Sequence, residues 1–150
     1  MLSLWQCNNA VYFQAFSSNC IQLAVLCVNY CAKVQGSTLK ILIQRCKYLR
    51  CLQLQQTNLT ADNMTAVEWE KAAALQELDI TATDLTQPAI IGMLQFKLTV
   101  TLTLTTFLML TTWLNDESLF ADVLTRIPGL VWLSAGQLDG MNDNVLAQVM

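Results

Sequence analysis

The stretch that decides the fold reads Cys20-Ile-Gln-Leu-Ala-Val-Leu-Cys-Val28, and its pattern of cysteine and leucine returns as Cys46-Lys-Tyr-Leu-Arg-Cys-Leu-Gln-Leu54. The same 26-residue period keeps leucine in one column along the chain: Leu26, Leu52, Leu78, Leu104 and Leu130. Self-similarity at one fixed period is typical of proteins built from stacked repeats, in which each repeat is one supersecondary unit. The sequence therefore predicts a repeat architecture.

Each repeat combines a short strand with a return helix. In Leu-x-x-Leu-x-Leu the last two leucines alternate with other residues at period 2, which places both on one face of a strand. Behind the strand, Leu39, Leu42 and Cys46 have the spacing of one stripe of an amphipathic helix. A column in these helices is apolar in five of its six rows: Phe16, Leu42, Glu68, Leu94, Phe120 and Leu146. Neither element buries its apolar face alone, so the units must stack, with parallel strands on a concave face and helices on a convex face.

The motif Leu-x-x-Leu-x-Leu-x-x-Cys/Thr, preceded by Cys-x-x-Leu, resembles the cysteine-containing leucine-rich repeats of F-box/leucine-rich-repeat proteins, in the ribonuclease-inhibitor-like superfamily. The resemblance covers nearly the whole chain. It implies an α/β leucine-rich-repeat solenoid, or horseshoe, of about five to six 26-residue units. It also implies that a small polar column, Cys31, Thr57 and Thr83, bonds to backbone inside the turns, and that the helical Cys20 and Cys46 pack in the core.

The same resemblance implies the substrate-recognition part of an SCF-type ubiquitin ligase receptor. The F-box that would dock the ligase scaffold has no counterpart in this sequence. By the repeat register the chain opens inside a strand and stops at Met150 within a helix, without the polar capping units that solenoids normally need. We therefore expect residues 1–150 to form a single leucine-rich-repeat domain that is a fragment of a longer solenoid.

Two segments depart from the regular pattern. The first strand, Leu2-Ser-Leu-Trp-Gln-Cys7, sits two residues late on the 26-residue grid. The segment from Leu98 to Leu114 contains no charge and seven threonines. A membrane helix needs about 20 predominantly apolar residues, whereas Thr99-Val-Thr-Leu-Thr-Leu-Thr105 alternates at period 2 and predicts a strand. Membrane association through Leu98–Leu114 is the less favoured alternative.

Helix starts are expected where side chains can cap exposed backbone amides. Thr60-Ala-Asp-Asn63 and Asn115-Asp-Glu-Ser118 supply such side chains, and Pro88 suits a first helical turn.

The charge of the chain argues against several classes of function. It carries eight Lys and Arg residues, no His and a formal net charge of −3. Nucleic-acid binding needs clustered basic residues, so no nucleic-acid partner is expected. Without histidine there is no Ser-His or Cys-His nucleophile, and pairs such as Glu68 with Glu70 on a helical face are typical solvated charges. We predict that the protein is not an enzyme.

Six cysteines lie in the first third of the chain: Cys7, Cys20, Cys27, Cys31, Cys46 and Cys51. The spacings from Cys27 to Cys31 and from Cys46 to Cys51 would also suit a four-thiolate zinc site. The repeat register instead places Cys20, Cys31 and Cys46 in core columns, where cysteine acts as a small apolar residue, and Cys27 and Cys51 on the concave face. We therefore expect no metal and no cofactor.

The compartment follows from the same cysteines and from the N-terminal composition. The first charged residue is Lys33, so the basic start of a secretory signal is missing. Reduced thiols then indicate a cytoplasmic or nuclear protein. The sequons at Asn58 and Asn63 would matter only in a secreted chain.

The candidate site is the concave face, where a protein partner would bind. Its residues alternate with the buried leucines, and in the fourth unit a register shift of two residues would preserve that alternation. The set combines a polar, mildly acidic centre with apolar edges and aromatic anchors, as protein interfaces do. Its members are Trp5, Cys27, Asn29, Tyr30, Gln53, Gln55, Glu77, Asp79, Thr81, Thr105, Phe107 and Leu133. The prediction is a protein–protein interaction module; the alternative is a non-catalytic structural segment of a longer scaffold protein.

Overall fold

The elements of the fold follow the predicted alternation of strand and helix. The computed structural model describes residues 1–3, 15, 19–83, 85, 89, 106–108 and 132–134, with the backbone alone for residues 3, 106–108 and 132–134. Its elements are β1 (Leu2–Ser3), β2 (Val25–Cys27), helix α2 (Gly36–Arg45), β3 (Cys51–Gln53), helix α3 (Ala61–Thr65), the 3-10 helix η1 (Trp69–Lys71), β4 (Glu77–Asp79), β5 (Thr106–Leu108) and β6 (Trp132–Ser134).

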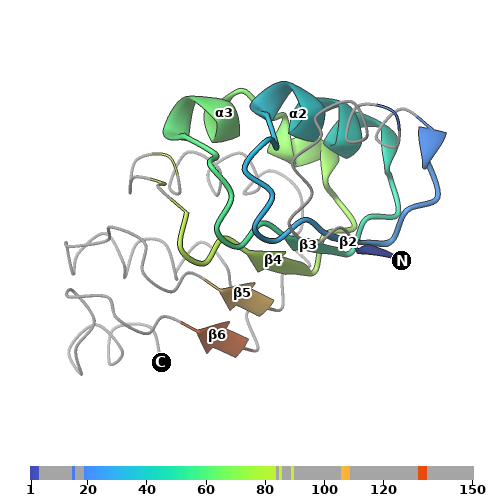
Figure 1. Cartoon of the computed structure of the whole chain (residues 1–150). Coiled ribbons are helices and arrows are strands. Elements are labelled where there is room, and N and C mark those ends of the chain that lie inside the picture. Colours follow the sequence, from blue (N-terminus) through green and yellow to red (C-terminus); the bar gives the residue numbers. More distant parts are fainter. Residues whose placement is uncertain are drawn as a thin grey trace.

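All six strands form one parallel sheet in chain order, β1-β2-β3-β4-β5-β6. Helices α2 and α3 lie on one side of this sheet, as Figure 1 shows, and each connects one strand to the next. Parallel strands need such a crossover because a tight turn cannot join them. The predicted α/β solenoid is confirmed. We call the sheet face opposite α2 and α3 the open face.

The register of the first four strands agrees with the sequence. Leu26 pairs with Leu52, and Leu52 pairs with Leu78, so each of these steps equals the predicted period. Leu2 pairs with Leu26, a step that is shorter than the period by two residues. This pairing confirms that the first strand sits late on the repeat grid.

The register predicted for the fourth unit is wrong. Leu78 pairs with Phe107, not with Leu104, so this step is longer than the period by three residues. The next step, from Phe107 to Leu133, equals the period again, so Leu130 also leaves the predicted column. The threonine–leucine alternation before β5 fits a strand in several registers. Its phase changes at the adjacent Thr105 and Thr106, so Phe107 lies an odd number of residues from Leu104.

The core lies between the sheet and the helices. The central leucines of β2, β3 and β4 are buried, and so are Leu54 and Ile80 just behind their strands. From the other side, α2 buries Leu39 and Leu42, which confirms the predicted helical stripe, and Cys46 beyond its end is buried too. Burying one such leucine side chain stabilises the fold by about 1.5–3 kcal/mol. Successive units therefore hold one another together along the sheet.

A glycine lets helices α2 and α3 approach each other. A Cβ built on Gly36 would lie 2.7 Å from Cα and 2.8 Å from the carbonyl oxygen of Asn63. Asn63 is fixed by a capping box, since its backbone amide donates to Thr60 Oγ1 and its Oδ1 accepts from the Thr60 amide. The predicted cap at Thr60 is confirmed, and the cap holds rigid backbone against the glycine.

Replacing Gly36 by alanine is expected to lower the free energy of unfolding by about 2 kcal/mol, because the methyl group displaces the backbone of Asn63. Alanine would otherwise favour a helix over glycine by about 1 kcal/mol, so the sign of the effect tests the contact. Urea unfolding followed by circular dichroism measures it. The exposed Ser37→Ala, one residue along the same helix, is the control. A Gly36→Ala variant as stable as the parent would show that the two helices are further apart.

Glu68, the one polar residue of the helical column, has a structural cause for its position. Helix α3 ends at Thr65 and η1 begins only at Trp69, so the apolar phase moves by one residue and Trp69 is buried instead of Glu68. Glu68 points to solvent and pairs with Lys40 at 3.4 Å and with Lys71. The hydrogen bond from Lys71 is the main cause that lowers the pKa of Glu68.

The small polar column bonds to backbone as predicted. Thr57 Oγ1 donates to the Leu54 carbonyl at 2.7 Å, and Thr83 Oγ1 donates to the Ile80 carbonyl at the same distance. The Cys31 thiol contacts a carbonyl of its own turn at 3.5 Å. All three side chains are buried, so each closes the turn that follows a strand.

A Thr57→Val substitution removes the buried hydroxyl while keeping the side-chain shape. We expect it to lower the free energy of unfolding by about 1–1.5 kcal/mol, because the Leu54 carbonyl loses a hydrogen bond in a buried site. Thermal unfolding measures the loss. Thr57→Ser retains the hydroxyl and serves as the comparison for the hydrogen bond. Equal stability of the valine variant and the parent would contradict the role given to this hydroxyl.

Candidate protein-binding surface

Two rows of residues flank the central leucines on the open face of the sheet. One row runs from Val25 through Cys51 to Glu77, and the other from Cys27 through Gln53 to Asp79, each formed by direct strand pairing. Side chains at these positions point away from the buried leucine because strand side chains alternate between faces. The centre of the described face therefore carries two neighbouring carboxylates and one amide. We call Gln53, Glu77 and Asp79 the open-face patch.

The patch is accessible. Glu77 is exposed, and Gln53 and Asp79 are half-buried. The ion pairs of Lys40 and Lys71 both involve Glu68 on the helical side, so neither lysine neutralises Glu77 or Asp79. The patch presents negative charge to whatever approaches the sheet.

Cys51 differs from the expectation that it projects freely onto this face. Only 8% of it is exposed, beside Glu77 in the same row. Burial, followed by a hydrogen bond with the Glu77 carboxylate, raises the pKa of the Cys51 thiol to about 12. Sequence alternation alone carries no information about how deeply such a side chain is buried. Cys27, two positions along the preceding strand, is half-buried.

Asn29 and Asp79 support the turns after their strands. Asn29 Oδ1 accepts a hydrogen bond from the Gln55 amide at 3.0 Å, and Asp79 Oδ1 accepts one from the Thr81 amide at 2.9 Å. Asn29 and Thr81 are buried, whereas Gln55 is half-buried. Of these predicted site residues, Asp79 and Gln55 offer surface to a partner, while Asn29 chiefly fixes backbone.

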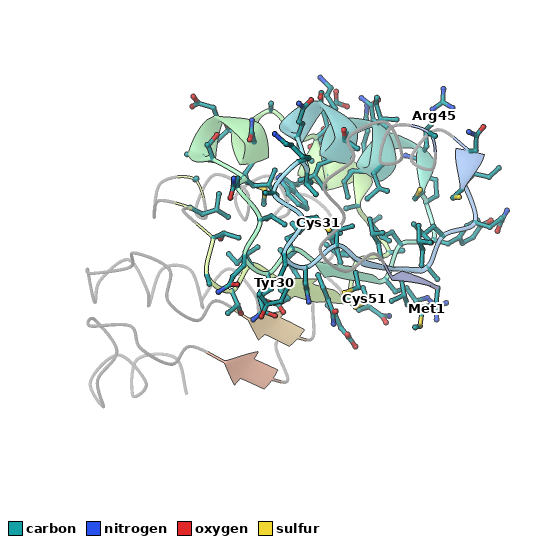
Figure 2. The ribbon with its side chains drawn as sticks, in the orientation of Figure 1. Met1, Tyr30, Cys31, Arg45 and Cys51 are labelled. Atoms are coloured by element: carbon teal, nitrogen blue, oxygen red, sulfur yellow. The ribbon has the colours of Figure 1, made fainter. Side chains whose placement is uncertain are left out.

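One residue in the turn after each of β2, β3 and β4 has a left-handed backbone conformation. Tyr30, Gln56 and Ala82 have φ angles of 62°, 51° and 52°, in a region that non-glycine residues seldom occupy. Backbone hydrogen bonds hold them there, from the Tyr30 amide to the Gln55 carbonyl at 2.8 Å and from the Gln56 amide to the Thr81 carbonyl at 3.0 Å. Figure 2 shows Tyr30 beyond one end of the strands, beside the edge of the open face. Tyr30 is therefore held on a rigid turn.

Of the remaining predicted site residues, two are not described and two take another register position. Trp5 and Thr105 lie outside the described residues. Phe107 and Leu133 take the register position of the central Leu78, not a flanking position. Their assignment to the open face rested on a shift of zero or two residues, and the observed shift of three removes that basis.

Neither alternative site appears in the described part of the chain. There, no group of three or more His, Cys, Asp or Glu residues is placed to hold a metal ion. The cysteines described, Cys20, Cys27, Cys31, Cys46 and Cys51, are free thiols. Across the same residues, no helix has the length and apolar character needed to cross a membrane. Within Leu98–Leu114 the described backbone is the strand β5.

The geometry has a counterpart among solved structures. The chain is similar to the C-terminal domain of tropomodulin from Caenorhabditis elegans, with a TM-score of 0.66 over 95% of this chain and 89% of that chain. This is a leucine-rich-repeat fold. The sequence identity is 14%, so the likeness concerns the leucine-rich-repeat fold alone. Neither the models of known protein families nor the sequences of curated proteins give a match.

Proposed function

We propose that this leucine-rich-repeat chain is a protein-recognition module whose partner binds the open face of the sheet. The observation that carries the proposal is the open-face patch, in which the exposed Glu77 and the half-buried Asp79 lie two residues apart on strand β4. Solenoids commonly use their extended sheet surface for partners. The negative charge disfavours nucleic acid, because its phosphates need cations.

Two double variants, each of which removes two negative charges, test the patch. Glu77→Gln with Asp79→Asn removes both charges, while asparagine keeps the oxygen that accepts from the Thr81 amide. The matched control is Asp62→Asn with Glu70→Gln, which makes the same charge change on α3 and η1. Tagged chains are purified from cells, and the proteins retained are compared by quantitative mass spectrometry.

We expect a partner that is retained by the parent and by the control but lost from the open-face variant. Both variants should keep the thermal midpoint of the parent, because the altered carboxylates are exposed or half-buried. Retention of the same proteins by all three chains would exclude the open face as the binding surface.

The finer proposal is that the module selects substrates for an SCF-type ubiquitin ligase in the cytoplasm or nucleus. Its support is the cysteine-containing repeat pattern, with Cys46 buried in the helical column and donating to the Cys20 carbonyl at 3.2 Å. The longest available transcript of the gene, expressed with a tag, should retain a cullin scaffold together with the partner. Retention of the partner without the scaffold would remove the ligase role and leave protein recognition in place.

A further inference from the structure

One edge of the solenoid repeats the same turn in three successive units. In each unit the backbone amide of a leucine donates to the carbonyl of the residue three positions earlier. The bonds run from Leu23 to Cys20 at 3.1 Å, from Leu49 to Cys46 at 3.1 Å and from Leu75 to Ala72 at 3.0 Å. The turns adjoin one another, because the Arg50 amide bonds the Ala24 carbonyl at 2.7 Å and the Gln76 amide bonds the Arg50 carbonyl at 2.8 Å. We call residues 20–24, 46–50 and 72–76 the leading rim, since each segment leads into a strand.

The leading rim and the turns of the candidate site lie at opposite ends of the strands. Figure 2 shows Arg45, one residue before the second rim segment, on the other side of the ribbon from Tyr30. A ligand on the leading rim therefore lies away from the turns that carry Tyr30, while Glu77 of the open-face patch directly follows the third rim segment.

Exposed apolar side chains gather on the leading rim. Among the described residues the exposed large hydrophobic side chains are Ile21, at 52%, Tyr48, at 57%, and the terminal Met1. Ile21 and Tyr48 belong to equivalent exposed turns of adjacent units, which the backbone bonds above bring side by side. Such a cluster marks an interaction site more often than isolated exposed residues do.

Positive charge flanks Tyr48 on the second rim segment. Lys47 and Arg50 are exposed on the rim, and Arg45 is exposed directly before it. The three rim segments contain no Asp or Glu. This is a concentration of cations in a chain whose net charge is −3 and whose open face is acidic.

We propose that the leading rim is a second binding surface and that it takes an acidic peptide segment bearing an apolar side chain. Ile21 and Tyr48 would bury the apolar side chain of the peptide, and Lys47 and Arg50 would pair with its carboxylates. Tyrosine and arginine are the residue types that most often dominate interface energies. The pairing is by complementary charge, which also speeds encounter.

Other anionic partners fit this surface less well. Nucleic acid would need cations along a run of phosphates. The cations within the rim are Lys47 and Arg50 of one segment, and Lys71, directly before the third segment, pairs with Glu68. A membrane surface would need a broader apolar face than two side chains in adjacent turns supply.

The test selects ligands from a displayed library of random peptides, using the whole chain as bait. We expect the enriched peptides to be rich in Asp and Glu with one aliphatic or aromatic residue. A synthetic peptide of the enriched sequence should bind about tenfold more weakly to Lys47→Glu and to Tyr48→Ser than to the parent. Lys33→Glu, an exposed lysine in the turn after β2, is the matched control and should bind like the parent.

Three outcomes would overturn the proposal. In the first, the enriched peptides lack acidic residues. In the second, the rim variants bind these peptides as well as the parent does. In the third, no peptide is enriched, and single-stranded RNA or phosphatidylserine vesicles bind the parent but not Lys47→Glu. Because the Glu77→Gln, Asp79→Asn variant retains an unaltered rim, it should bind the selected peptide normally. Failure of the open-face proposal and failure of this one are thereby distinguishable.

Discussion

Replacing Trp69 by alanine is expected to lower the free energy of unfolding by about 4 kcal/mol. Trp69 is fully buried at the start of η1, and its Nε1 donates to the Met64 carbonyl at 2.8 Å. The substitution leaves a large cavity behind the sheet and removes this hydrogen bond. It also disconnects η1 from α3, which the hydrogen bond joins. Urea unfolding followed by circular dichroism gives the free energy directly.

Trp69→Phe separates the two causes. Phenylalanine keeps much of the apolar volume but has no ring N–H, so its loss should be about 1–2 kcal/mol. Glu70→Ala, next to it on the outside of η1, should have little effect on stability. A loss below about 1 kcal/mol for Trp69→Ala would place η1 outside the cooperative core.

Cys51 is expected to react with iodoacetamide about a thousandfold more slowly in the folded chain than in urea. The reactive species is the thiolate, and burial beside Glu77 raises the pKa of Cys51 from 9.0 to about 12. A raised pKa means that the folded state holds its proton more tightly than the unfolded state. The stability linked to Cys51 is therefore fully present below pH 9 and is lost as the pH rises from about 9 toward about 12.

Brief alkylation at pH 8, followed by digestion and mass spectrometry, measures this rate. Cys27 is an internal control because it is half-buried on the adjacent strand. Glu77→Gln removes the carboxylate that helps to raise the pKa of Cys51, so this variant should react faster than the parent. Equal rates for Cys51 and Cys27 in the folded parent would contradict the buried position of Cys51.

Most of the described fold was predictable because it depends on short-range periodicity. The leucine column placed β2, β3 and β4, and the helical stripe through Leu39 and Leu42 placed α2. The late position of the first strand was also predicted correctly from Leu2. These features follow from apolar residues that must meet a shared core, and every unit repeats that requirement.

The fourth unit was not predictable from the same pattern. Here leucine and threonine alternate along the segment, so more than one frame puts leucine on the buried face. The pairing of Phe107 with Leu78 lies three residues beyond the expected frame, which the alternation alone does not predict. The three extra residues also reversed which residues of β5 and β6 flank the central position.

The candidate site was predicted in outline. Strand alternation correctly placed Gln53, Glu77 and Asp79 in the flanking rows of the sheet. It could not reveal that Cys51 and Asn29 are buried, because the alternation along a strand does not encode the depth of burial. The leading rim was missed as well, although exposed Tyr48 between Lys47 and Arg50 in a turn is a signal that the sequence contains.

The near-constant step between paired strands has a consequence for the route by which the chain folds. The central positions of the six strands follow one another at almost even spacing, so each new pairing closes a loop of nearly the same length. Closure entropy changes only with the logarithm of loop length, so adding each unit costs about the same. No distant pairing has to form first. We expect folding to begin at any adjacent pair of units and to proceed from there one neighbouring unit at a time. Local unfolding should then begin in the units at either end of the folded array.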